Sequence, residues 1–147
     1  MNFRITFCLS FLMAFFFHAS LTQAQCKAFA KETCLPLMAP FTHNGQLNSV
    51  TLTAGHSVQL EMTFYKGQNY RILVCAQEVL GKVTFKVFDA DKNLVYSSKE
   101  KAGADYWDFN LKSTQQLFIE VAAALPPGTS NNNPPSGCVT LLVGFEE

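Results

Sequence analysis

The feature that most limits the fold of this chain is a series of short runs in which every second residue is apolar. In the clearest run, residues 58–64, Val58, Leu60 and Met62 alternate with polar residues. This period of two is typical of a strand with one buried face. Comparable runs recur along the chain with turn residues between them, at 82–87, 94–97, 107–111 and 117–121. The sequence therefore predicts an all-β fold, an antiparallel jelly-roll-like β-sandwich preceded by a short N-terminal helical segment.

Two other runs, 70–76 and 139–143, are apolar at nearly every position, which indicates central strands covered on both faces. We expect them to pair antiparallel, with Val74 opposite Val139, because this register builds an apolar stripe on one face. The same register sets Cys75 opposite Cys138, within reach of a disulfide.

The second face of this strand pair carries Leu73 and Leu142 and therefore needs a cover. The N-terminal segment, residues 25–45, is the available candidate. It contains helix-forming residues up to Thr33 and is then interrupted by prolines, so it predicts a helical turn followed by an extended stretch. Its apolar residues that face the sheet in this interpretation are Phe29, Leu35, Leu37 and Phe41.

Four cysteines remain once the leader is removed, and they predict two disulfides. If Cys75 pairs with Cys138, then Cys26 pairs with Cys34, which requires a bent or short helix between them. In the alternative, Cys26 and Cys34 each bond to one of the two sheet cysteines and fasten the N-terminal segment to the sheet. Both arrangements are open at this point.

The first residues have the order of a secretory signal peptide, with Arg4 followed by an apolar run from Ile5 to Phe17. The run is shorter than the roughly 20 residues that span a bilayer as a helix, so we expect cleavage near Ala24 and no stable membrane insertion. A lipid anchor on Cys26 is disfavoured, since no small residue precedes it directly. The expected parts are the signal peptide 1–24, the segment 25–45 and the sandwich 46–147, in a secreted or periplasmic protein.

Charge argues against some partners. The whole chain has 11 Lys plus Arg and 11 Asp plus Glu, and the lysines are scattered among acids rather than clustered. Nucleic acid recruits proteins through clustered cations, so it is not an expected partner.

The strand from Tyr70 to Val74, the hairpin from Val83 to Val95, and the strands at 117–121 and 139–143 resemble the secreted bacterial pre-peptidase C-terminal (PPC-type) β-sandwich pattern. The resemblance covers about residues 46–145. It implies a sandwich fold, export, and a non-catalytic domain that aids adhesion, substrate binding or maturation. The four cysteines and the N-terminal segment depart from the pattern, and no peptidase is attached.

One candidate metal site is Asp89, Asp91 and Asn93, with Glu100 at the twelfth place of the segment. Alternating oxygen ligands suit calcium, yet Leu94 stands where a calcium loop of the EF-hand type needs glycine. The competing interpretation is a β-turn in which Asn93 is left-handed and the aspartates bond local amides. No cofactor other than this calcium ion is expected.

A candidate ligand site is Asp105, Tyr106 and Asp108, where acids and aromatics interleave as on sugar-binding surfaces. Trp107 shares its face with Phe109 and belongs to the core by parity. The two mature histidines, His43 and His56, lie beside turns without metal-ligand spacing, and the sequence contains no catalytic motif that we recognise.

The leading hypothesis is a non-catalytic exported binding or accessory module. It acts through surface loops, above all the Pro/Asn-rich loop 126–137, on a protein or glycan of the cell envelope or extracellular space. The alternative is a structural subunit of an envelope or secretion assembly that uses the face around Leu73 and Leu142 as an interface. A hydrolase with paired carboxylates ranks third.

Overall fold

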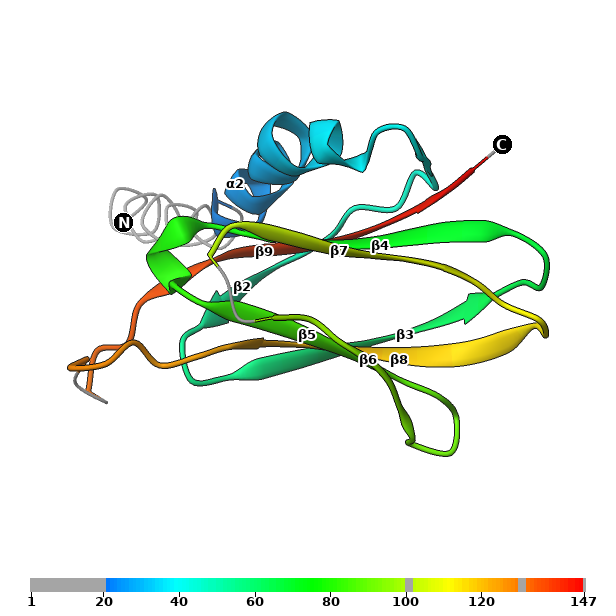
Figure 1. Ribbon diagram of the computed structural model, residues 1–147. Helices are drawn as coiled ribbons and strands as arrows, with labels where there is room; N and C mark the ends of the chain where they lie inside the picture. Colours follow the sequence, from blue (N-terminus) through cyan, green and yellow to red (C-terminus); the bar gives the residue numbers. More distant parts are fainter. Residues whose placement is uncertain (1–20, 100–101, 130–131, 147) are drawn as a thin grey trace, which may run out of the picture.

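The computed structural model describes residues 21–99, 102–129 and 132–146, which form two antiparallel sheets packed face to face (Figure 1). The larger sheet contains β1 (Thr42–His43), β2 (Asn48–Thr53), β9 (Ser136–Phe145), β4 (Asn69–Ala76) and β7 (Ala104–Asn110). The smaller sheet contains β3 (Ser57–Phe64), β8 (Gln115–Ala123), β5 (Val83–Phe88) and β6 (Leu94–Ser97).

The strand order confirms the predicted fold. In the larger sheet both β1 and β2 pair with β9, which is followed by β4 and β7, and the smaller sheet runs β3, β8, β5, β6. Successive strands therefore change sheet at most connections, and the two paths interlock as two Greek keys. This is the arrangement of a jelly roll.

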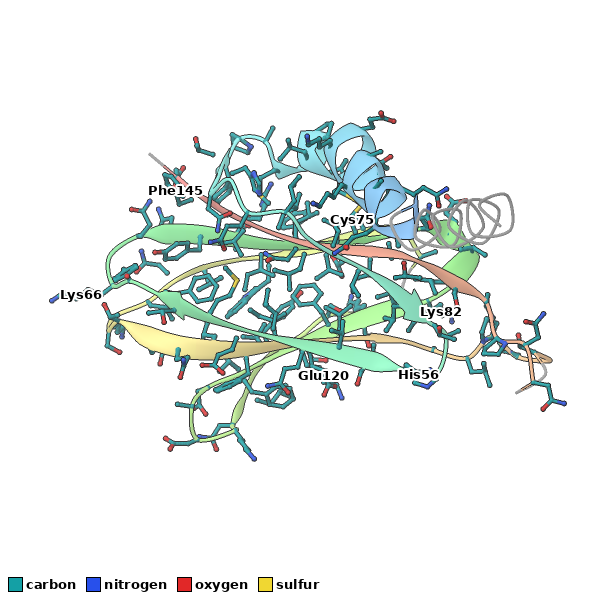
Figure 2. The ribbon with its side chains drawn as sticks, turned by 180° about the vertical axis from the view of Figure 1, so that it is seen from behind. His56, Lys66, Cys75, Lys82, Glu120 and Phe145 are labelled. Carbon is teal, nitrogen blue, oxygen red and sulfur yellow. A yellow bond between two sulfur atoms is a disulfide. The ribbon has the colours of Figure 1, made fainter. Side chains whose placement is uncertain are left out.

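The alternating runs become strands with one face in the core. In β8, Leu117, Ile119 and Val121 are buried while the residues between them are half-buried, and β5 buries Val83, Phe85 and Val87 in the same way. These side chains meet the inner residues of the larger sheet in one continuous apolar core between the layers (Figure 2). The predicted inner and outer faces of these strands are confirmed.

The two continuous apolar runs pair as neighbours, since β4 and β9 lie side by side in the larger sheet and are buried on both faces. The predicted register is wrong by two residues. Val74 lies opposite Leu141 rather than Val139, and Cys75 lies opposite Thr140. A shift of two leaves every side chain on its predicted face, so the apolar pattern alone does not distinguish the two registers.

A helical cap covers the outer face of the larger sheet (Figure 1). It consists of α2 (Leu21–Phe29), the π-helical turn η2 (Ala30–Cys34) and the 3₁₀ turn η3 (Leu35–Met38). The predicted extended stretch after Thr33 is therefore wrong up to Met38. Proline at the start of η3 lacks an N–H that this position does not use, so it begins the turn instead of ending the helix.

The cap buries Leu73 and Leu142, which are 1% and 0% exposed, against Cys34 and Met38. Phe29, Leu35 and Phe41 pack at the edge of this second cluster, as predicted, whereas Leu37 is 47% exposed and is not part of the cover. The structural-subunit hypothesis required the face around Leu73 and Leu142 to be free. The cap removes that surface.

The disulfides follow the second of the two predicted arrangements. Cys26 bonds to Cys138 with a Cα–Cα distance of 5.2 Å, and Cys34 bonds to Cys75 with 5.7 Å. The pairing of Cys75 with Cys138 is wrong because the true register sets each sheet cysteine beneath the cap, not opposite the other. Both bridges therefore fasten the cap to the sheet.

Residues 1–20, which hold most of the predicted signal peptide, lie outside the described residues, and Ala24 lies within α2. Among the described residues, no helix is both long and apolar enough for a bilayer crossing.

Candidate functional site

The sandwich has two open sides, where the edge strands of the two sheets face each other. On the side of β6 and β7, three aromatic rings fill the space. Tyr96 stacks on Trp107 with ring centroids 4.8 Å apart, and Trp107 stacks on Phe109 at 4.2 Å. Trp107 is thus part of the core, as its parity predicts. This side of the sandwich is closed by side chains.

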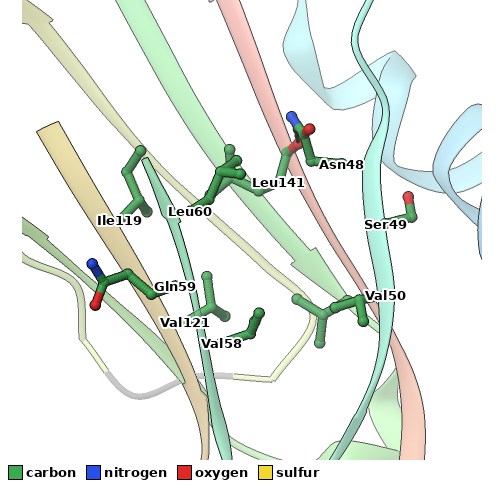
Figure 3. A pocket seen from close by; sticks show the side chains of 10 residues that line it. Asn48, Ser49, Val50, Val58, Gln59, Leu60, Ile119, Val121 and Leu141 are labelled. Atoms are coloured by element: carbon green, nitrogen blue, oxygen red, sulfur yellow. Dashed lines mark hydrogen bonds between the residues drawn. The ribbon is translucent and has the colours of Figure 1, made fainter. Parts of the chain in front are cut away.

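The side of β2 and β3 contains a slot between the sheets, a cavity of about 170 Å³ (Figure 3). In Figure 3, Val50 of β2 and Val58 of β3 face each other across the gap. The walls are mainly aliphatic and come from both sheets. They include Val50, Val58, Leu60, Ile119, Val121 and Leu141.

The slot follows from the inward residues of β2. Leu52 reaches the core, but the two preceding inward positions are Asn48 and Val50, which are too short to close the gap. Asn48 turns its amide back to donate to the carbonyl of Leu141 at 3.3 Å, and Val50 remains 42% exposed. The slot is therefore apolar inside and open to solvent.

The strands beside the slot are sheet edges. Within the described residues, β2 pairs only with β9, and β3 pairs only with β8. Each strand therefore has one row of backbone groups without a strand partner. An edge of this kind is a template for an extended segment of another chain, and β3 is eight residues long.

The structure divides the predicted site Asp105, Tyr106 and Asp108. Tyr106 and Asp108 lie on the outer face of β7, opposite Leu73 and Arg71 of β4, whereas Asp105 lies on the inner side with Trp107. The three side chains therefore do not form one ligand site.

Asp108 and Tyr106 hold a residue that the sequence analysis missed, Arg71, whose side chain is 10% exposed. Arg71 donates from Nε and Nη2 to the two carboxylate oxygens of Asp108, both at 2.7 Å. Its Nη1 donates to the carbonyl of Ala39 at 3.0 Å, and its guanidinium lies between the rings of Phe41 and Tyr106, 4.5 and 4.1 Å from their centroids.

The hydrogen bond to Asp108 raises the pKa of Arg71 above its ordinary value, against the opposing effect of burial. The cluster fixes the end of the cap to the sheet through a bidentate ion pair and two ring faces. We interpret it as structural. The sequence did contain a sign of this cluster, because Arg71 is the one charged residue within the apolar run 70–76.

The candidate calcium residues form a tight turn. Asp89 Oδ1 accepts from the backbone amides of Asp91 and Asn93 at 3.0 and 2.8 Å, and Oδ2 accepts from the Asn93 side chain at 3.0 Å. These bonds lower the pKa of Asp89 below its ordinary value, the Asn93 side chain contributing most. The left-handed residue is Lys92, with φ of 64°, so the expectation for Asn93 is wrong.

No group of three metal-binding side chains gathers within 21–99, 102–129 and 132–146. Glu100, the fourth candidate, lies outside the described residues. The calcium site stays a prediction.

The Pro/Asn-rich loop is shorter than predicted, because β9 begins at Ser136. Its ends are tied to the sandwich. Pro135 accepts from the amide of Ala54 at 2.9 Å, Ala124 donates to the carbonyl of Lys82 at 3.0 Å, and the hydroxyls of Ser136 and Thr53 bond at 2.8 Å. None of the described residues of this loop lines the slot.

The histidines lie beside turns, as predicted. His43 accepts from the amide of Gly45 at Nδ1 and donates from Nε2 to the carbonyl of Gln46, while His56 is exposed at the turn between β2 and β3. Neither lines the slot.

Comparison with known proteins shows the fold. No family model matches the chain, and no curated protein matches it. The pre-peptidase C-terminal domain of a collagenase from Bacillus anthracis has a similar structure, with a TM-score of 0.50 and 17% identity over 67% of this chain and 87% of that one. A periplasmic inhibitor of g-type lysozyme from Aeromonas hydrophila is also similar, with a TM-score of 0.50 and 12% identity over 69% and 85% of the two chains. The chain thus resembles the PPC domain in fold, as the sequence indicated.

Proposed function

We propose that this chain is an exported, non-catalytic binding module that holds an extended segment of an extracellular or cell-envelope protein along the open side between β2 and β3. The slot carries the proposal, because it places an apolar cavity directly beside two strand edges that have no strand partner among the described residues. The partner's backbone bonds to an edge, and one aliphatic side chain enters the slot. The slot supplies selectivity, and the backbone bonds supply much of the affinity.

The size of the cavity supports a side chain as its occupant. About 170 Å³ is below the roughly 300–1,000 Å³ of pockets that enclose a small molecule. It accommodates a single branched or aromatic side chain. Burial of such a side chain stabilises the complex by about 1.5–3 kcal/mol.

Export is supported by the signal-peptide pattern of residues 1–24 and by the two disulfides, which persist in oxidising compartments. The lysozyme inhibitor offers a precedent at the level of fold, since its function is to act on another protein. A protein partner is thus compatible with a sandwich of this architecture.

The test selects a random heptapeptide library on the oxidised mature domain. We expect enrichment of extended sequences with one aliphatic residue, and slowed hydrogen exchange at the amides of β2 or β3 in the complex. Val50→Phe should fill the slot and weaken the selected peptide by about tenfold or more. The matched control is Val95→Phe, which adds the same ring to a similarly exposed valine of β6, 43% against 42%, and should leave binding unchanged.

A loop-shortened variant distinguishes the slot from the loop hypothesis. Residues 128–133 are replaced by a short glycine-rich turn, while Pro126 and Pro135 are kept, since the carbonyl of Pro135 accepts from the amide of Ala54. The proposal predicts full peptide binding by this variant. Loss of binding here, together with retention in Val50→Phe, would assign recognition to the loop and overturn the slot.

A further inference from the structure

The outer face of the smaller sheet carries two aromatic residues side by side. Phe88 of β5 lies directly opposite Phe118 of β8, at positions where the alternation places polar residues such as Lys86 and Glu120. Both rings are half-buried although no element of the described residues packs over them. Two adjacent, half-buried aromatic rings at outward positions of a strand pair form an apolar patch, and such a patch is a candidate ligand surface.

These rings form the floor of a hollow of about 310 Å³. Its lining consists of Gln59, Phe88, Ala90, Lys92, Phe118 and Glu120. In Figure 1 the turn between β5 and β6 projects from this sheet, and in Figure 2 Glu120 lies on the smaller sheet. The volume is at the lower end of small-molecule pockets, which suits one or two rings.

The turn 89–93, which forms one wall of the hollow, is preorganised by its own hydrogen bonds. The carboxylate of Asp89 accepts three hydrogen bonds from within the turn, and the amide of Lys92 donates to the Asp89 carbonyl at 3.0 Å. Lys92 keeps a left-handed backbone, φ 64°, which is uncommon for a residue other than glycine. A wall fixed in this way loses little entropy when a ligand binds.

The polar groups of the rim are unused. The side chains of Gln59, Glu120 and Lys92 make no hydrogen bond or ion pair with another described residue. They supply an amide, a carboxylate and an ammonium group around the aromatic floor. Because the positive and negative charges offset each other, the rim favours a neutral, hydroxyl-rich ligand over an anion.

We propose that this hollow binds a neutral sugar ring of a glycan. A pyranose has an apolar face of C–H groups, which packs on the two phenylalanine rings. The hydroxyl groups around the edge of the ring bond to the amide, carboxylate and ammonium of the rim. A wholly apolar ligand would instead desolvate these polar groups without replacing their hydrogen bonds. The site is separate from the slot and does not depend on the proposed protein partner.

The test titrates the oxidised mature domain with tetrasaccharides of N-acetylglucosamine, glucose and mannose, up to about 10 mM, the range of weak sugar binding. Amide NMR spectra report which residues respond. We expect saturable shifts in β5, β8 and the 89–93 turn with at least one sugar. Phe118→Ala should weaken that sugar by about tenfold, and Glu120→Gln, which preserves shape, should weaken it severalfold.

Thr84→Ala is the control, since Thr84 lies on the same face of β5, outside the hollow and opposite Ala122, and it should bind like the wild type. Val50→Phe should also bind sugar normally, so failure of the slot and failure of the hollow are separate results. The sugar assignment is overturned if no tetrasaccharide gives saturable shifts, if the shifts map elsewhere, or if both Phe118→Ala and Glu120→Gln bind as the wild type does. A response of the hollow only to the slot-selected peptide would replace the sugar with a protein segment.

Discussion

The two sheets differ in what lies on their outer faces. The larger sheet is covered by the helical cap (Figure 1), which buries Leu73 and Leu142. The outer face of the smaller sheet carries Lys86, Glu120 and Leu94, which is 56% exposed. The first face is apolar because a cover exists. The second face is mixed, since polar residues such as Lys86 and Glu120 lie beside Phe88 and Phe118.

The covered face also shows how a short cap is retained. Short helices are marginal in water, so the cap needs bonds to the sheet. Two disulfides attach it, and Arg71 clamps its end through Asp108 and the carbonyl of Ala39. The covered face of the larger sheet therefore contributes to stability, whereas the uncovered face of the smaller sheet is free to bind a ligand.

The largest expected loss of stability follows from removing the disulfides that attach the cap to the sheet. They close loops with sequence separations of 112 and 41. Replacing either pair with alanine should lower the free energy of unfolding by about 4–5 kcal/mol in the chain-entropy relation, slightly more for Cys26 and Cys138. Denaturant unfolding measures this, and hydrogen exchange should accelerate first in α2 and η2. Losses below about 1 kcal/mol for both pairs would show that packing alone retains the cap.

A smaller effect is expected when the clamp loses its carboxylate charge. Asp108→Asn leaves the guanidinium of Arg71 without an anionic partner, and we expect a loss of about 1–2 kcal/mol. The value is modest because the Asp108 side chain is 41% exposed and solvent screens the pair. Asp91→Asn on the uncovered face is the matched control and should be neutral within about 0.5 kcal/mol. Equal effects of the two variants would contradict the clamp.

The smallest effect concerns the turn on the uncovered face. The pKa of Asp89 is lowered in the folded protein, so its stabilising effect is present above its ordinary pKa of 3.8 and is lost as pH falls through the lower folded value. Asp89→Ala should therefore unfold at a lower Tm at neutral pH, and the gap to the wild type should narrow below pH 3.8. A gap independent of pH would contradict a role for the ionised carboxylate.

Most strands were predictable because their signal is local, whereas β2, which forms one side of the slot, was not among the expected strands. The alternation at 58–64 and the turn residues around 67 and 89–93 identify β3, β5 and β6 without knowledge of any partner, and the unbroken runs identify β4 and β9 as covered on both faces. The need for a cover followed from Leu73 and Leu142. The extent of the helical cap did not, since a proline at the start of a 3₁₀ turn and a proline that ends a helix look the same in sequence.

The candidate sites were less predictable because they depend on contacts between distant residues. Tyr106 and Asp108 were noticed for their chemistry, but their partner Arg71 is 37 positions from Asp108. The slot exists because the side chains of Asn48 and Val50 do not fill the space between β2 and β3, and this is visible only once the two strands are placed opposite each other. The hollow requires Phe88 and Phe118 to be neighbours, which only the pairing of β5 with β8 establishes.

The sequence by itself determined where the strands from β3 to β9 lie, which of their faces lie inside, and that one sheet needs a cover, but it did not reveal β1 or β2. These properties depend on the alternation of apolar and polar residues with a period of two, which is a local property of the sequence. The tertiary structure alone decided the register of β4 on β9, the choice of disulfide partners, the Arg71 clamp and the two cavities. A slip of two residues preserves every inside and outside assignment, so only the packing of the whole chain selects among registers that the pattern treats as equal.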